Sequence, residues 1–257
     1  MIDAGSHGAV NWVDLSTPDV DAAEAFYRDL FGWTIERSTS PMGEYLIGSV
    51  GEHQVGGMME QRSELQGMAP VWTVFFSVHD MAGTIARAKD AGGTLVEAPF
   101  PIPGDAMVAV LADPSGAMLA VIAGPNPGDA YFSHDPGAVC WVELLTHDPT
   151  AAEGFYTAVF GWKSLTQRAA QTTYTMFSID DEDVAGMMMM PDEVPVDAPA
   201  HWAVYFAVAD TTATERRALQ LGGNVLHPTT EIDIGRFAVL ADPQGATFQL
   251  MEFAESV

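Results

Sequence analysis

Apolar positions along the chain follow two periods, and each change of period marks a new element. Residues 12–15 alternate as a strand with two different faces does. Apolar residues then recur at helical spacing and form one stripe: Ala23, Phe26, Tyr27, Leu30 and Phe31. Gly32 follows and supplies a residue able to adopt the left-handed conformation that ends many helices. Shorter strand-like runs at 44–49 and 54–59 complete a βαβββ unit.

The same unit occurs four times, at about 8–60, 70–123, 137–190 and 199–253. In each, a strand-like run ends near an Asp, a helix-like run follows, and a Gly closes it. The spacings from Asp to Gly are 13, 12, 13 and 12 residues, for Asp19/Gly32, Asp80/Gly92, Asp148/Gly161 and Asp210/Gly222. An Asp at a helix start accepts hydrogen bonds from unpaired backbone amides, so we predict one helix within each pair.

The two halves of the chain are copies of one another. Between residues 8–33 and 137–162, sixteen of twenty-six positions are identical at a constant offset of 129. The same offset relates two shorter segments of each half, 57–59 with 186–188 and 111–117 with 240–246. Turn-forming residues fill 124–129. We therefore predict one domain over residues 1–123, a linker over 124–136 and a second domain over 137–257.

Composition narrows the classes of partner. Hydrophobic residues make up 48% of the chain, enough for a substantial core, and 35 acidic against 10 basic residues give a formal charge of -25. Nucleic acids and anionic membranes both need clustered Lys and Arg, so neither is expected as a partner. The acids are scattered, which favours a solvated acidic surface over an acidic functional patch.

The single cysteine, the first residues and the lengths of the apolar runs exclude several further classes of site and location. The single cysteine, Cys140, excludes a disulfide within the chain and a Cys-rich zinc site. It lies in a strand with no basic partner evident, so an inert buried thiol is favoured over a nucleophile. The first residues lack a secretory leader pattern, and no apolar run is long enough to span a bilayer. We expect a cytoplasmic monomer or homodimer.

Two motifs carry a resemblance to a known family. An Ala-rich helix ends in Phe-Tyr…Phe-Gly-Trp at 26–33 and again at 155–162, and Asp-Pro-x-Gly closes each half at 113–116 and 242–245. Together they resemble the vicinal oxygen chelate superfamily of glyoxalases, bleomycin resistance proteins and dioxygenases, over nearly the whole chain. Within that superfamily the chain resembles an actinobacterial two-domain glyoxalase-like group, loosely labelled hydroxylases. The resemblance implies an α+β fold in which the four βαβββ units pair into two tandem domains, each a curved sheet around a cavity.

Enzymes of this family usually bind a divalent metal ion through His and Glu, and the resemblance locates those ligand positions here. They are occupied by Trp12, Thr73 and Ala120 in the first half and by Trp141, Ala203 and Gln249 in the second. None of these is a good ligand for a divalent cation. Two other residues keep metal binding as an alternative. One is His201, which lies two positions from Ala203 on the same strand face, and the other is Glu60. We expect no cofactor, with a divalent metal as the alternative.

Strand parity indicates what would line the cavities instead. Asp14 shares a face with Trp12, and Glu143 with Trp141. The other expected lining residues are Thr73, Phe75, Met118 and Ala120 in the first cavity, and Ala203, Tyr205, Thr247 and Gln249 in the second. Each pocket is then mostly apolar and aromatic with one carboxylate, a composition typical of small-molecule sites.

Each of these features has a functional and a structural interpretation. Asp14 and Glu143 are candidate general bases or partners for a cationic ligand, or else carboxylates that hydrogen-bond to the protein. Trp12 and Trp141 stack on a flat ligand, or else fill the space of a missing metal site. The run 187–190 of four Met is a pliable pocket wall or ordinary core.

Three functions remain open from the sequence. The first, which the missing metal ligands favour, is metal-free binding of a small apolar or aromatic molecule. The second is a family enzyme, a glyoxalase-like lyase, isomerase or dioxygenase, that uses a divalent metal or Asp14 or Glu143 as a general base. The third is an interaction protein with vestigial pockets, which no sequence feature supports.

Overall fold

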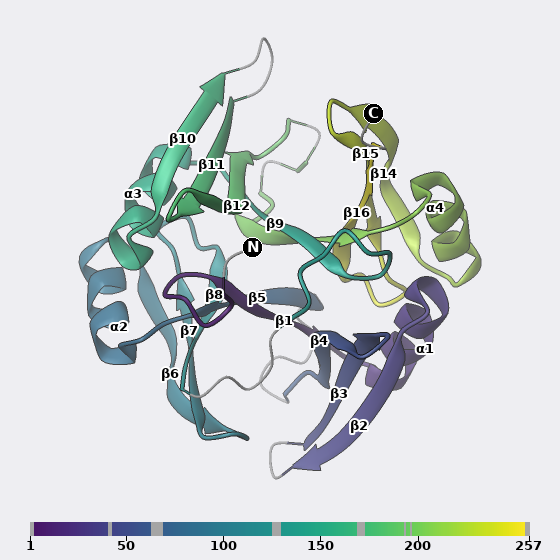
Figure 1. Ribbon diagram of the computed structural model, residues 1–257, viewed down its shortest axis with the longest axis horizontal. Coiled ribbons are helices and arrows are strands. Elements are labelled where there is room, and N and C mark those ends of the chain that lie inside the picture. Colours follow the sequence, from purple (N-terminus) through teal and green to yellow (C-terminus); the bar gives the residue numbers. More distant parts are fainter. Residues whose placement is uncertain are drawn as a thin grey trace. The chain divides into compact units, whose positions relative to one another are not determined.

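The computed structural model describes residues 3–40, 43–62, 69–124, 130–168, 173–192, 194–195 and 197–254. Sixteen strands and four helices lie within them (Figure 1). They form four βαβββ units in chain order, as the sequence predicts. Within the predicted linker, residues 125–129 lie outside the described part.

The first half contains β1 Val10–Thr17, α1 Val20–Phe31, β2 Thr34–Ser40, β3 Gly43–Val50, β4 His53–Glu60, β5 Val71–Ser77, α2 Met81–Asp90, β6 Thr94–Ile102, β7 Ala106–Ala112 and β8 Met118–Ala123. The second half contains β9 Val139–Thr146, α3 Pro149–Phe160, β10 Lys163–Arg168, β11 Thr173–Ile179, β12 Glu182–Met189, β13 His201–Ala207, α4 Thr211–Gln220, β14 Asn224–Ile232, β15 Gly235–Ala241 and β16 Thr247–Phe253. No described helix is long and apolar enough to cross a membrane.

The strands form two eight-stranded sheets with the same topology. Their orders are β2-β3-β4-β1-β5-β8-β7-β6 and β10-β11-β12-β9-β13-β16-β15-β14. In every unit the first strand pairs in parallel with the last, and the remaining strands pair antiparallel. Each sheet thus follows one half of the sequence, and the α+β prediction of two tandem domains of this type is confirmed.

The predicted helix signals lie where the helices begin and end. The side chains of Asp19, Asp80, Asp148 and Asp210 each accept a hydrogen bond from the backbone N–H three residues later. Gly32 and Gly161 end α1 and α3 with φ of 73°. The other two helices end two residues before the predicted Gly, which has positive φ. Asp therefore satisfies a free amide at each helix start, as expected.

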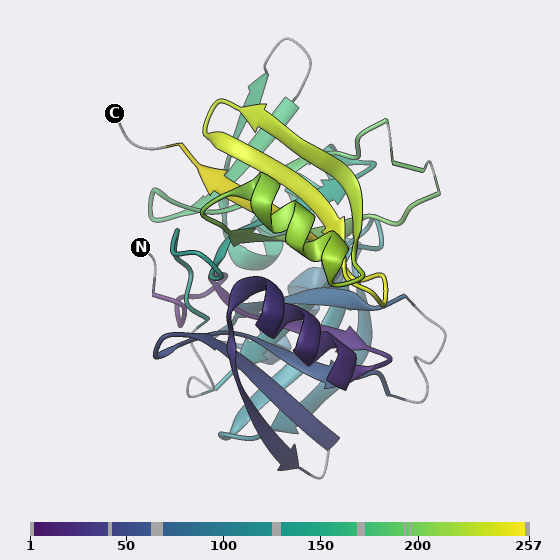
Figure 2. The same cartoon turned by 90° about the vertical axis from the view of Figure 1, so that its right-hand side faces the viewer.

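The chain packs into two compact units that take residues from both halves. Unit 1 comprises residues 1–11, 73–129 and 142–203, and unit 2 comprises residues 12–72, 130–141 and 204–257. Helices α2 and α3 pack together in unit 1, while α1 and α4 pack together in unit 2 (Figure 1). The pair α1 and α4 faces the viewer in Figure 2. The predicted domain boundaries at residues 123 and 137 follow the sheets and stay a prediction.

In unit 2, the two family-like motifs meet in the core. Tyr27 is fully buried, and its hydroxyl donates to Asp242 Oδ2 at 3.2 Å while it accepts from Trp72 Nε1 at 3.1 Å. Trp33 stacks on Tyr27, with ring centroids 5.7 Å apart, and its Nε1 donates to the Gly137 carbonyl at 2.8 Å. Tyr and Trp of the first motif therefore hold the Asp-Pro-x-Gly turn and the start of the second half.

Unit 1 repeats this arrangement with the other copies of the motifs. Tyr156 donates to Asp113 Oδ2 at 3.1 Å and accepts from Trp202 Nε1 at 3.0 Å. Trp162 donates from Nε1 to the Gly8 carbonyl at 3.1 Å. Both motifs thus have a structural reason to be present that is independent of any ligand.

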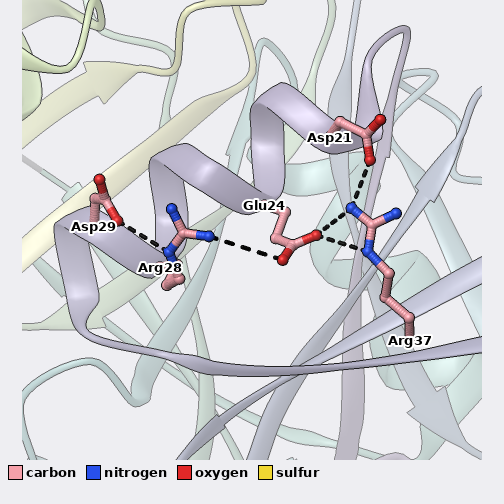
Figure 3. A network of polar contacts seen from close by, with 5 residues as sticks. All are labelled: Asp21, Glu24, Arg28, Asp29 and Arg37. Atoms are coloured by element: carbon pink, nitrogen blue, oxygen red, sulfur yellow. Dashed lines mark hydrogen bonds and ion pairs between the residues drawn. The ribbon is translucent and has the colours of Figure 1, made fainter.

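The outer face of α1 carries a network of charged side chains (Figure 3). Arg37 on β2 contacts Glu24 and Asp21, the latter at 2.5 Å, and Arg28 lies 3.0 Å from Asp29. Apart from Glu24, these side chains are exposed, so each pair adds little to stability. Through Arg37, the network links the edge strand β2 to α1.

Candidate functional site

The first candidate acid lies in a small aromatic and polar cluster in unit 2. The parallel register of β1 and β4 sets Asp14 beside Gly57, and the β2-β3-β4 hairpins bring Tyr45 over the same place. Tyr45 donates its hydroxyl to Asp14 Oδ1 at 2.5 Å, and Trp12 Nε1 lies 2.8 Å from the same oxygen. Trp12 Nε1 is also 2.7 Å from the Tyr45 hydroxyl. The predicted proximity of Trp12 and Asp14 is therefore present, with Tyr45 as a third member.

Burial sets the protonation of this cluster. It raises the pKa of Asp14 to about 6, and the hydrogen bonds from Tyr45 and Trp12 oppose that rise. Burial, with the charge of Asp14 next in size, raises the pKa of Tyr45 well above its usual value, so Tyr45 remains a donor. Within the described residues both donors meet Oδ1 of Asp14, and no donor is seen on Oδ2. Oδ2 therefore keeps its capacity to accept a hydrogen bond.

Gly57 makes room for the cluster. A Cβ at this position would lie 2.0 Å from the Tyr45 hydroxyl and 2.1 Å from Asp14 Oδ1. Real side-chain contacts are never that short, so any other residue must push Tyr45 or Asp14 aside. A glycine here has a packing reason, because the position lies under the Tyr45–Asp14 hydrogen bond.

In unit 1, the second half repeats the acid, the tyrosine and the glycine of this site. Glu143 is buried and paired with Gly186, as Asp14 is with Gly57. Tyr174 is paired with Met188 in the register that Tyr45 has with Met59. Trp141 precedes Glu143 by two residues on β9. The acid, the tyrosine and the glycine therefore recur with equivalent strand pairing.

Sequence reasoning missed both tyrosines, although the repeat contained the signal. Tyr45 and Tyr174 are separated by 129 residues, the offset that relates the two halves. Parity along β1 identified Trp12 and Asp14, but the partner on β3 comes from a hairpin register that the alternation of β1 does not contain.

The remaining residues predicted for the first cavity lie in unit 1 and differ in exposure. Ala120 belongs to a buried hydrophobic cluster with Ala106, Val108 and Ile122, and the partly buried Phe75, Phe100 and Ile102 pack against it. Thr73 is half-buried, whereas Met118, at the start of β8, is 40% exposed. The inner end of this strand face is therefore packed by the protein itself, and its outer end faces solvent.

The residues predicted for the second cavity also vary. Ala203, Tyr205 and Gln249 are buried, with Tyr205 paired to Gln249 across β13 and β16, whereas Thr247 is exposed. Oε1 of Gln249 is buried and has no hydrogen-bond partner among the described residues. A buried oxygen without a partner is costly, so this amide marks a position where a ligand or a water molecule would restore a bond.

The unpaired side-chain oxygen of Gln249 leads to a prediction about stability. Replacing Gln249 with Met keeps the length of the side chain and removes the unsatisfied oxygen, so we expect the free energy of unfolding to rise by about 1 kcal/mol in urea titrations. The same change at exposed Gln220 should have almost no effect. A loss of stability at position 249 would mean that water already satisfies the amide.

Other predicted features agree with their structural interpretation. Burial raises the pKa of Cys140 to about 12, which leaves the thiol unreactive. Met187 and Met190 are buried in the core, while Met189 is half exposed. His201 is half-buried, with Nδ1 2.9 Å from the Pro199 carbonyl oxygen.

The residues present do not fit the family's metal site. Trp, Thr, Ala and Gln side chains at the matching positions offer no strong ligand, and within the described part of the chain no three His, Cys, Asp or Glu residues come together. Independence of a metal ion stays a prediction. Two hollows of the described surface, of about 290 and 300 Å³, are not lined by predicted site residues.

Comparison with known proteins agrees with this architecture. Residues 9–121 match the model of the Glyoxalase/Bleomycin resistance protein/Dioxygenase superfamily, and residues 141–251 match that of a glyoxalase-like domain. The anthracycline biosynthesis protein DauV of Streptomyces sp. (strain C5) is 37% identical over 262 residues, covering 97% of this chain and 94% of that protein. The putative glyoxylase CFP32 of Mycobacterium tuberculosis is 34% identical over 250 residues, covering 95% of each.

Solved structures show the same fold at low identity. The 2,3-dioxygenase LapB from Pseudomonas sp. KL28 aligns with a TM-score of 0.65 and 14% identity over 97% of this chain and 93% of its own. The Mn(II)-bound glyoxalase from Novosphingobium aromaticivorans aligns with a TM-score of 0.64 and 16% identity, over 96% and 82%. With both halves matched by family models and relatives that span nearly the whole chain, this protein belongs to the glyoxalase/bleomycin resistance protein/dioxygenase superfamily, in a two-domain form.

Proposed function

We propose that the protein binds a small, largely apolar or aromatic molecule at its acid-centred sites without using a metal ion. The observation that carries this proposal is the buried Asp14, whose two protein donors both meet Oδ1 and leave Oδ2 to accept from a ligand. The donor set of the family's metal site is replaced by residues that do not coordinate, and the acid itself supplies the polar contact.

The chemistry of the cluster limits the ligand. Trp12 and Tyr45 supply aromatic surface, and an ionised Asp14 accepts from an O–H or an N–H group. Anthracyclines, named in the relative DauV, are planar aromatic molecules with several hydroxyl groups and fit this description. We propose ligands of that class, with Glu143 as the centre of a second site.

A family enzyme is the second candidate, and the pKa of Asp14 favours it. A carboxylate with a pKa of about 6 is ionised at neutral pH and is a stronger base than an ordinary Asp. It would take a proton from an acidic O–H or C–H group of the bound molecule. The relative CFP32, named a putative glyoxylase, supports an enzyme as the alternative.

The test is a binding titration with an anthracycline, followed by tryptophan fluorescence and calorimetry at several pH values. A proton competes with the ligand for Asp14, so affinity should fall as pH drops through about 6, by about tenfold for each further pH unit, and level off above it. Asp14→Asn keeps the shape, removes the charge, and should abolish this pH dependence. Asp90→Asn, which removes one exposed charge, is the matched control.

Three outcomes would decide against parts of the proposal. Saturable binding with an unchanged pH profile in Asp14→Asn would exclude Asp14 as the acceptor. Binding that disappears after chelation and returns with Mn²⁺ or Fe²⁺ would show a metal site that the described residues do not contain. Consumption of the anthracycline by wild type, but not by Asp14→Asn, would favour the enzyme.

A further inference from the structure

Residues 3–8 form a strap in unit 1 that is held at the end of β5. Ser77 Oγ donates to the Ala4 carbonyl at 2.5 Å, and His79 Nε2 lies 3.1 Å from the Gly5 carbonyl oxygen. The Gly8 amide donates to the Ser77 carbonyl at 2.7 Å. The strap is therefore fixed by backbone and side-chain bonds to one strand end.

His7 is the strap residue whose contacts depend on its protonation. Its Nδ1 accepts a hydrogen bond from the His79 backbone N–H at 3.3 Å, which requires a lone pair on Nδ1. Its Nε2 lies 3.5 Å from Nη2 of Arg87 on α2, a permanent cation. A second proton on His7 would remove the acceptor and set a new positive charge beside Arg87.

Most of the surroundings of His7 disfavour its protonated, charged form. Burial, then Arg87 and then His79 lower the pKa of His7, while the Val159 carbonyl of α3 and Asp80 at the start of α2 oppose this. No carboxylate lies within ion-pair distance of Arg87 among the described residues, whereas Arg217, its equivalent on α4, lies 3.9 Å from Asp29. His7 thus faces a cation with no acid paired to it in the described part of the chain.

The duplicate half lacks these polar groups. At the equivalent positions, His7 is replaced by Pro136, Ser77 by Ala207 and His79 by Ala209. The backbone bond remains, since the Gly137 amide donates to the Ala207 carbonyl at 2.8 Å as that of Gly8 does to Ser77. The strap of residues 3–8 therefore has a titratable histidine among its contacts, and the equivalent segment of the second half does not.

The strap also borders a polar hollow. A space of about 300 Å³ is lined by Gly5, Asn11, Ser77, Val78, His79, Ile122 and Gly124. Because Gly5 belongs to the strap, moving the strap removes one wall and exposes the polar end of β5. We propose that protonation of His7 releases residues 3–8 from unit 1 and opens this hollow, so that mild acid acts as a switch on the N-terminal segment.

The direction of the pH effect follows from the linkage between protonation of His7 and attachment of the strap. The attached strap holds His7 with a lowered pKa, and the released strap holds it near the ordinary value of 6.5. Well above that value His7 is neutral in both forms and attachment is unaffected. As pH falls through this ordinary pKa, His7 of the released form takes up a proton before His7 of the attached form, so attachment weakens.

The test is amide hydrogen exchange by NMR at about pH 7.5 and about pH 5.5, corrected for intrinsic exchange rates. The protection of the Gly8 and His79 amides should fall several-fold at the lower pH, while that of Gly137 should stay unchanged. In His7→Gln, which keeps an acceptor but cannot become charged, Gly8 protection should no longer depend on pH. An equal change at Gly137, or a pH dependence that persists in His7→Gln, would overturn the proposal.

Discussion

Replacing Asp242 with Ala is expected to lower the free energy of unfolding by about 3 kcal/mol, measured by urea or thermal denaturation. Its Oδ1 accepts from the backbone amides of Gln244, Gly245 and Ala246, each at 2.9 Å, and its Oδ2 accepts from Tyr27. The carboxylate is fully buried, so these donors would lose their acceptor inside the protein.

Less severe changes should separate the contributions at this turn. Asp242→Asn retains an acceptor for the amides and loses the charge, so about 1 kcal/mol is expected, and Tyr27→Phe should cost a similar amount. Exposed Asp233→Ala is the control and should change stability by less than about 0.5 kcal/mol. An Asp242→Ala protein as stable as that control would show that the turn does not need its side-chain acceptor.

The Tyr27–Asp242 contact also shows which part of the fold the sequence does not reveal. Local signals located the helices well, because an N-terminal Asp and a C-terminal Gly act within one turn of the chain. Tyr27 and Asp242 are separated by 215 positions, and no local pattern indicates that they share a core. The repeat established two equivalent halves and their sheets, whereas the compact units join parts of both.

Some residues of the candidate site could also be predicted from local sequence, and others could not. Strand alternation placed Trp12 and Asp14 together because both lie on β1. The exposure of Met118 and Thr247 was not predictable from parity, since parity gives the face of a strand and not the depth along it. Tyr45 depended on hairpin register, and Gly57 is explained only once Tyr45 and Asp14 are seen above it.

Replacing Gly57 with Ala is therefore expected to damage the site by adding a single carbon atom. The new Cβ would occupy the space of the Tyr45 hydroxyl and Asp14 Oδ1, so the bond between them must break. A hydrogen bond to a charged group is worth about 1.5–3 kcal/mol, so we expect affinity for the anthracycline probe at neutral pH to fall about tenfold or more. The free energy of unfolding should fall by about 1–3 kcal/mol.

The pH profile separates this effect from general damage. Tyr45 and Trp12 lower the pKa of Asp14 against the effect of burial, so losing them should move the midpoint of binding above about 6. Gly154→Ala in α3 is the control, because nothing lies within 4 Å of its new Cβ and Ala favours a helix. Combined with Asp14→Asn, Gly57→Ala should cause little further loss of affinity, since both act through one carboxylate. Fully additive losses, or an unmoved midpoint in Gly57→Ala alone, would mean that Tyr45 does not position Asp14 for binding.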